Sequence, residues 1–207
     1  MGVGRSADTM LNIIRFLPLI LLFQSSPARE TIEKDISQWV QVLQPMRSGL
    51  SALVNLIWLL DLENVEEFRN LFYYRIGIPL GGWNKFLLGL AKKLCKPRDS
   101  LYIETSSIGP GILIRHGVAT VIQAERIGRE CLIFQEVVIG PKMDGAEGKP
   151  IIGDYVRISA GAKVLGPITI GDHSIIGANA VVTKDVGPNC IAVGVPAKIV
   201  SLERGKQ

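Results

Sequence analysis

The sequence predicts a bundle of α-helices in residues 1–98, followed by a parallel β-helix in residues 99–207. Two patterns carry this prediction. Apolar residues recur at helical spacing as far as Pro97, and β-branched apolar residues then recur every six positions. Hydrophobic residues make up 47% and charged residues 20% of the chain, a composition typical of folded proteins and not of disordered ones.

The first apolar segment, residues 11–23, is too short to span a bilayer and is interrupted by Arg15 and Pro18. Arg5 before this segment and the small residues 25–28 after it would also suit a signal peptide. We favour a helix that packs within the bundle or against another copy of the chain.

Further helices are expected before Pro97. Ser26 is predicted to cap one of them, with Pro27 in its first turn. Its apolar face would consist of Ile32, Ile36, Trp39, Val40 and Leu43. The apolar spacing predicts the remaining helices within residues 50–62, 63–77 and 83–94.

The second half of the chain repeats with a period of six residues. The repeated apolar residue is Ile152, Ile158, Val164, Ile170, Ile176 and Val182. The preceding part keeps the period with one slip, at Ile108, Ile114, Val121, Ile127, Ile133 and Ile139. Short strands separated by sharp corners fit this period, and three strands make one triangular coil of roughly eighteen residues. Each coil buries its apolar face only by stacking on its neighbours.

The repeat stops in residues 140–150, which are polar and rich in glycine and proline. This segment carries Lys142, Asp144, Glu147 and Lys149. We expect it to form a loop that leaves the solenoid, because binding residues are often found on loops held by a regular scaffold.

The charge and the cysteines restrict the class of protein. The net charge is +4 and the basic residues are mostly scattered, which favours a mildly basic surface over a nucleic-acid site. The three cysteines, Cys95, Cys131 and Cys190, lack zinc or redox spacing and predict a reduced, cytoplasmic protein.

The sequence resembles the hexapeptide-repeat acyltransferases, most closely the serine acetyltransferase branch and related polysaccharide-modifying O-acetyltransferases. The resemblance is carried by FRNLFYYRIG (68–77), ILIRHGVATVI (112–122), the repeats that follow, and AVGVPAKIV (192–200). It implies a left-handed coil, acetyl-CoA as co-substrate without a metal, and a homotrimer or hexamer. A carbonic-anhydrase-like β-helix would need about three histidines for zinc, whereas this chain has two.

The resemblance places the catalytic base at His116. A hydroxyl is a poor nucleophile until a base takes its proton, and imidazole is the usual base near neutral pH. His116 also lies where the six-residue period slips, so it need not be a buried repeat residue. Leu101 stands where the family has an aspartate that pairs with the histidine, so Glu104 or Glu125 would have to orient His116 instead.

The resemblance also implies a cofactor site, in which small residues let acetyl-CoA approach the backbone and other residues lie near its phosphates. The small residues are Ser159, Ala160, Gly161, Gly177 and Ala178, and the residues near the phosphates are Lys184, Pro196, Ala197 and Lys198. His173, the other histidine, is expected to be a surface residue.

Two positions depart from the serine-specific branch. Arg115 replaces an acidic residue just before the histidine, and Lys149 replaces a loop histidine that precedes a proline. Both residues are candidates for binding the acceptor. The departures leave serine and a sugar hydroxyl in surface polysaccharide biosynthesis open as acceptors, and a non-catalytic trimeric scaffold is a further alternative.

Overall fold

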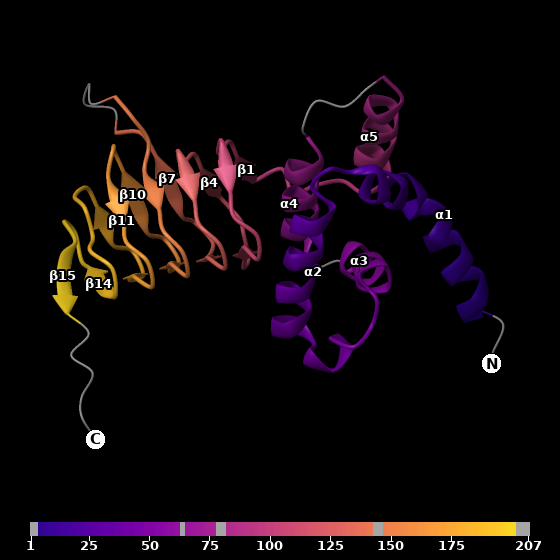
Figure 1. Cartoon of the computed structure of the whole chain (residues 1–207), viewed down its shortest axis with the longest axis horizontal. Coiled ribbons are helices and arrows are strands. Elements are labelled where there is room, and N and C mark those ends of the chain that lie inside the picture. Colours follow the sequence, from indigo (N-terminus) through magenta and orange to yellow (C-terminus); the bar gives the residue numbers. More distant parts are fainter. Residues whose placement is uncertain (1–3, 63–64, 78–81, 143–146, 202–207) are drawn as a thin grey trace. The chain divides into compact units, whose positions relative to one another are not determined.

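The computed structural model describes residues 4–62, 65–77, 82–142 and 147–201. The chain divides into two compact units, Met1–Arg98 and Asp99–Gln207 (Figure 1). The first unit is helical, as predicted. Its elements are α1 (Gly4–Ser25), α2 (Arg29–Leu43), the 3₁₀ helix η1 (Pro45–Arg47), α3 (Ala52–Asp61), α4 (Glu66–Ile76) and α5 (Gly82–Leu94).

Apolar side chains from α1 to α4 form the core of the helical unit. Phe16 and Leu19 of α1 are fully buried, as expected for a helix that packs within the bundle. The Trp39 ring of α2 stands edge-on to Phe68 of α4, with 5.4 Å between the ring centroids. Within the described residues, none of the helices combines the length and the apolar character needed to cross a bilayer.

The start of α2 differs from the prediction. Its N-cap position is Ala28, and Ser26 lies in the turn before it. The Ser26 hydroxyl accepts a hydrogen bond from the Ala28 amide at 3.1 Å, so it closes that turn instead of capping the helix. The prediction of Ser26 as the cap is therefore wrong, because the hydroxyl bonds two residues ahead and not into the first helical turn.

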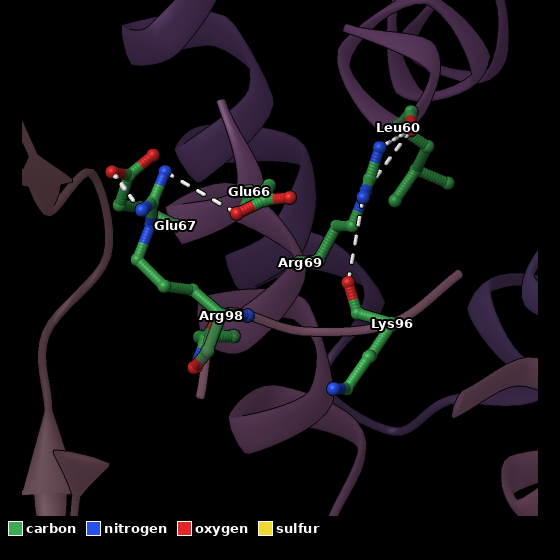
Figure 2. A network of polar contacts seen from close by, with 7 residues as sticks. Leu60, Glu66, Glu67, Arg69, Lys96 and Arg98 are labelled. Carbon is green, nitrogen blue, oxygen red and sulfur yellow. Dashed lines mark hydrogen bonds and ion pairs between the residues drawn. The ribbon is translucent and has the colours of Figure 1, made fainter. Parts of the chain in front are cut away.

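Buried arginines tie α4 to its neighbours. Arg75 pairs with Asp35 of α2 through Nε–Oδ2 at 2.8 Å and Nη2–Oδ1 at 3.2 Å, and both side chains are almost fully buried. Arg69 donates to the Leu60 carbonyl from Nε at 3.2 Å and from Nη2 at 2.9 Å, and to the Lys96 carbonyl from Nη1 at 3.4 Å (Figure 2). These bonds satisfy the Leu60 carbonyl in the last turn of α3 and the Lys96 carbonyl just beyond the end of α5.

The last residues of the helical unit are also bound to α4. Arg98 forms ion pairs with Glu66 at 3.3 Å and Glu67 at 3.2 Å (Figure 2). The Asn70 side chain donates to the Arg98 carbonyl at 3.0 Å and accepts from the Arg98 amide at 2.8 Å. This two-way bond fixes the backbone where the helical unit ends.

The second unit is a parallel β-helix of short strands. They are β1 (Leu101–Ile103), β2 (Ser107–Ile108), β3 (Leu113–Ile114), β4 (Thr120–Ile122), β5 (Arg126–Ile127), β6 (Leu132–Ile133), β7 (Val138–Gly140), β8 (Ile151–Ile152), β9 (Arg157–Ile158), β10 (Lys163–Leu165), β11 (Thr169–Ile170), β12 (Ile175–Ile176), β13 (Val181–Val182), β14 (Cys190–Val193) and β15 (Lys198–Ser201).

In the described part of the chain these strands form the three faces of a triangular coil. Sheet A has the order β1-β4-β7-β10-β13, sheet B β11-β8-β5-β2, and sheet C β15-β14-β12-β9-β6-β3. The pairs are parallel except β14 with β15, which are antiparallel. The orange and yellow strands of Figure 1 show this stack of coils.

The six-residue repeat forms the core, with one correction. The repeated residues from Ile152 to Val182 are buried, as predicted. In β4, however, the inward residue is Ile122, which is fully buried and pairs with Ile139, whereas Val121 is only half-buried. The assignment of Val121 to the repeat is wrong, because the chain makes a larger insertion just before β4 than a single slip suggests.

The insertion lies in the corner that carries His116. Ile114 is in register with Ile133, and Val121 is in register with Val138. Residues 115–120 therefore span the same part of the coil as residues 134–137, so this corner has two more residues than the corner above it. The corner between β4 and β5 is one residue shorter than the repeat. The spacing along the sequence therefore shows only one of the two extra residues.

Candidate active site

The corners between sheets C and A stack on one another along one edge of the β-helix, here called the C–A edge. It consists of residues 115–119, 134–137, 159–162 and 177–180 of successive coils. Backbone hydrogen bonds connect the corners: Glu136 donates to Val118 at 2.9 Å, Gly161 to Gln135 at 3.0 Å, and Asn179 to Ala160 at 2.9 Å. The candidate base and most candidate cofactor residues lie on this edge.

His116 is exposed in the enlarged corner and adopts a left-handed backbone conformation, with φ 53°. Two residues beyond the repeat allow the chain to bulge there, so the imidazole points out of the core instead of filling it. Arg115 precedes it and is half-buried, and its amide donates to the Ile133 carbonyl at 2.8 Å. The exposure agrees with the sequence expectation that His116 is not a repeat residue.

The small residues predicted for the cofactor lie on the same edge as His116. Ser159, Ala160 and Gly161 form the corner of one coil, and Gly177 and Ala178 belong to the corner of the next. A Cβ atom on Gly177 would lie 2.7 Å from Val193 Cγ1, and a Cβ on Gly161 would collide with Asn179. A side chain at either position would therefore have to displace Asn179 or Val193, and the lack of a Cβ leaves backbone close to the surface.

The C-terminal residues meet the same edge. The Ala197 amide donates to the Val181 carbonyl at 2.9 Å, and the Val181 amide donates to the Gly194 carbonyl at 3.0 Å. Pro196 and Lys198 are exposed, and Lys198 begins β15, where it is in register with Val193. Pro196, Ala197 and Lys198 therefore lie beside the corner that contains Gly177 and Ala178.

Two side chains were missed by the sequence analysis, Gln135 of the C–A edge and Lys163 at the start of β10. The Gln135 Oε1 atom is buried and accepts no hydrogen bond from the described part of the chain. The Lys163 ammonium donates to the carbonyls of Glu136 at 2.6 Å and Gly161 at 2.9 Å, which holds two corners together. Neither residue belongs to a recognisable sequence motif, because the environment of each depends on how the coils stack.

Three predicted residues lie on a different edge, between sheets A and B. Glu104 follows β1, Lys149 precedes β8, and Lys184 follows β13. Glu104 accepts a hydrogen bond from the Gln123 amide nitrogen at 2.6 Å, and all three side chains are exposed. Within one chain the structure does not bring Glu104, Lys149 or Lys184 to His116.

The loop predicted for residues 140–150 leaves the solenoid at this A–B edge, after β7. Asp144 lies outside the described residues, whereas Lys142, Glu147 and Lys149 are described and exposed. Gly148, with φ 119°, packs so closely on Pro167 that a Cβ there would lie 2.9 Å from the Pro167 Cβ. The end of the loop at Gly148 thus packs against the next coil at Pro167.

The strand beside the His116 corner offers a carboxylate that the sequence analysis did not consider. Leu101, at the family's aspartate position, is buried and in register with Thr120 at the end of the His116 corner. The Thr120 amide donates to the Ser100 carbonyl at 3.1 Å. Asp99 immediately precedes that contact and is exposed, two residues before Leu101.

His173 and Cys131 lie on another edge of the β-helix. His173 is exposed and stacks on Tyr155, with 4.7 Å between ring centroids and 5° between planes, on the edge between sheets B and C. Burial raises the pKa of the Cys131 thiol to about 12, which keeps it protonated and unreactive. Across the described residues, no group of three or more histidine, cysteine, aspartate or glutamate side chains is arranged to hold a metal.

Comparison with known proteins connects this edge to a transferase family. Residues 149–184 match the family described as bacterial transferase hexapeptide (six repeats). The serine acetyltransferase of Mycobacterium tuberculosis (strain ATCC 25618 / H37Rv) is 45% identical over 95 residues, which are 45% of this chain and 42% of that protein. The chain spans between 39% and 59% of the length of the first curated relatives that it matches.

Solved structures match over more of the chain. The soybean serine acetyltransferase complexed with serine superposes with a TM-score of 0.64 and 30% identity, over 86% of this chain and 72% of that one. A serine acetyltransferase in complex with CoA superposes with a TM-score of 0.58 and 28% identity, over 86% and 72%. These matches confirm the predicted left-handed parallel β-helix that follows a helical bundle.

Proposed function

Since the chain belongs to the hexapeptide-repeat transferases and is serine acetyltransferase-like, we propose that it transfers the acetyl group of acetyl-CoA to a hydroxyl, with serine as the acceptor. The observation that carries this proposal is the C–A edge. His116 is exposed there on a two-residue insertion, and the small residues of later coils follow on the same edge. A scaffold without catalysis would not need the two-residue insertion on which His116 is exposed.

In the proposed reaction His116 acts as general base and then as general acid. The imidazole takes the proton of the acceptor hydroxyl while the oxygen attacks the thioester carbonyl. The carbon–sulfur bond then breaks, and the imidazolium returns the proton to the leaving CoA sulfur. The products are the acetyl ester and free CoA, so no metal or redox partner enters the balance.

The stacking of the coils sets the length of the proposed cofactor site. Gly177 lies three coils above His116 along the C–A edge, so three strand spacings separate them, or about 14 Å. An extended pantetheine chain would run along this edge past Ser159, Ala160 and Gly161, with its thioester at His116. Its phosphates would then lie near Pro196, Ala197 and Lys198, where the lysine supplies a positive charge.

The residues of the A–B edge enter the proposed site from a second copy of the chain. Lys149 and Lys184 lie away from His116 within one chain, as does Glu104. A three-fold assembly of β-helices would place the A–B edge of one copy opposite the C–A edge of the next. Lys149 would then face the acceptor beside Arg115, Lys184 would lie near the CoA phosphates, and Glu104 would face His116.

A sugar hydroxyl is the second candidate acceptor, and Arg115 and Lys149 favour it. Serine carries an amine and a carboxylate, and a selective site must pair both groups or leave them poorly solvated. Arg115 and Lys149 suit a carboxylate, but neither can hold the amine. A sugar presents only hydroxyls, which donors on the loop at residues 147–149 would satisfy.

Kinetics with purified protein, acetyl-CoA and a panel of L-serine, free hexoses and nucleotide-linked hexoses decide between these acceptors. We expect acetyl transfer with kcat/KM highest for L-serine. Higher kcat/KM for any sugar, with little O-acetylserine formed, would replace serine by that sugar. Absence of CoA release with every acceptor would contradict the transferase proposal and leave the scaffold alternative.

A further inference from the structure

The side-chain amide of Gln135 lies at the C–A edge without a hydrogen-bond partner in the described part of the chain. Its Oε1 atom is buried there and accepts no hydrogen bond. The Nε2 atom also lacks a partner among the described residues, but it is not one of the buried atoms. A buried amide oxygen that has lost water without gaining a donor is unfavourable for folding, so it requires an explanation. A ligand that brings a donor would supply one.

Gln135 occupies a position that recurs in successive coils of this edge. The Gly161 amide donates to the Gln135 carbonyl at 3.0 Å, and the Asn179 amide donates to the Ala160 carbonyl at 2.9 Å. Gln135, Ala160 and Ala178 each precede the left-handed residue of their corner. The three residues are therefore equivalent and stack on one another. Of these three positions, only the one nearest the candidate base carries a polar side chain.

The same line of equivalent positions continues into the enlarged corner. The Glu136 amide donates to the Val118 carbonyl at 2.9 Å, in the pattern that connects the later corners. Val118 therefore stands at the position below Gln135, and His116 precedes it by two residues on the insertion. Gln135 thus lies between the corner of the candidate base and the alanines of the later coils, on the path proposed for pantetheine.

The spacing of the coils matches the spacing of amide groups in the cofactor. Neighbouring strands lie about 4.8 Å apart. In the pantetheine arm of acetyl-CoA, three bonds separate the thioester sulfur from the first amide nitrogen, which places these atoms about 4 Å apart when the arm is extended. A thioester held at the coil of His116 would therefore bring this amide to the level of Gln135. The second amide, about 5 Å farther along, would reach the coil of Ala160, where only backbone groups can bind it.

A primary amide complements a secondary amide, because it offers both a donor and an acceptor. Rotation of the Gln135 amide would bring Oε1 to the surface without breaking a hydrogen bond within the described residues, because neither of its polar atoms makes one. On the basis of the proposed acetyl transfer, we propose that Gln135 is a cofactor-binding residue. Its Oε1 atom accepts a hydrogen bond from the amide nitrogen nearest the thioester of acetyl-CoA, which fixes the thioester carbonyl beside His116.

Two short thioesters test this hydrogen bond. S-acetyl-N-acetylcysteamine keeps the first amide of the cofactor, whereas 2-(acetylthio)ethyl acetate has an ester oxygen in place of the N–H group. We expect the wild-type protein to use the amide with a kcat/KM about tenfold higher, because the ester lacks the donor. Gln135→Met keeps the length of the side chain and removes both polar atoms, so it should use the two thioesters about equally well. Gln41→Met, at an exposed position of α2, should keep the wild-type preference.

Calorimetric titration with CoA tests the same contact without turnover. We expect Gln135→Met to raise the Kd of CoA about five- to tenfold, and Gln41→Met to leave it unchanged. The Tm of Gln135→Met should be equal to or above that of the wild-type protein, because the variant lacks the buried oxygen without a donor. If CoA binds the wild-type protein but acetyl transfer occurs with no acceptor, the proposed function fails alone, and the Kd values of the variants still test Gln135.

Three outcomes would overturn the role of Gln135. The first is no binding of CoA to the wild-type protein, which would contradict the proposed function as well. The second is an equal Kd of CoA in the wild-type protein and Gln135→Met, and a lower Tm of that variant would then show a role in packing. The third is an unchanged preference for the amide thioester in Gln135→Met together with a higher KM for the acceptor, which would show that Gln135 binds the acceptor instead.

Discussion

The reaction proposed at the C–A edge depends on one imidazole, so His116→Ala is expected to lower kcat by about 10²–10⁴-fold, the range for general acid–base catalysis. CoA should still bind, because the corners at Gly161 and Gly177 are unchanged. Steady-state kinetics and CoA titration by calorimetry measure the two effects. His173→Ala is the matched control, since that exposed histidine lies on the B–C edge. Near wild-type turnover in His116→Ala would place the base elsewhere.

The carboxylate that orients His116 is a separate matter. Asp99 precedes the Ser100–Thr120 backbone contact at the end of the enlarged corner, whereas Glu104 lies on the A–B edge and is bonded to Gln123. We expect Asp99→Asn to lower kcat about tenfold or more with little change in KM, because a misoriented imidazole accepts the proton poorly. Glu104→Gln should have a smaller effect. The kcat values and pH–rate profiles of the two variants measure these effects. A larger loss of kcat in Glu104→Gln than in Asp99→Asn would assign the role to Glu104 of a neighbouring copy.

At the scale of elements, α2 and α4 are joined by an ion pair within the bundle core. Asp35 and Arg75 are 1% and 6% exposed, and two hydrogen bonds connect them. Asp35→Ala is expected to lower the free energy of unfolding by about 3–5 kcal/mol, since it removes a carboxylate that makes two hydrogen bonds to a buried guanidinium. Denaturant unfolding measures this change. The double variant Asp35→Leu, Arg75→Met should recover much of the loss, and no recovery would show that the pair itself stabilises the fold.

The helices and coils were predictable because each is encoded by local spacing. Residues from Ile152 to Val182 repeat every six positions, and each is buried where the period places it. The corner at His116 was only partly predictable. Its two extra residues are offset by a shorter corner before β5, so the count shows one slip and assigns Val121 in place of Ile122. The spacing along the sequence shows only the sum of the insertion before β4 and the shortening before β5. The register of the strands is needed to see each of them.

The candidate site was predictable to a similar degree. The small residues of the C–A edge follow from the repeat, because equivalent positions in successive coils must share an edge. Glu104 and Lys149 were expected near His116 but lie on another edge of the same chain. Asp99, Gln135 and Lys163 were not found, because their positions depend on contacts between coils that are distant in sequence.

At the scale of the whole molecule, the proposed division of the site between two edges would require more than one copy of the chain. We expect trimers, or multiples of three, in sedimentation equilibrium at micromolar concentration. Mixing inactive His116→Ala with inactive Lys149→Glu chains, after dissociation and reassembly, should restore part of the activity. Restoration is expected because some interfaces then pair a wild-type His116 with a wild-type Lys149. A monomeric protein with full activity would contradict this arrangement.

The left-handed backbone of His116 has a consequence for stability. Such a conformation costs a residue with a Cβ atom roughly 1–2 kcal/mol, and glycine avoids this cost. His116→Gly is therefore expected to unfold at higher denaturant concentration than the wild-type protein while losing its turnover. The active chain would thus be less stable than its own inactive variant, and a selection for thermal resistance alone would tend to remove the residue on which the proposed activity depends.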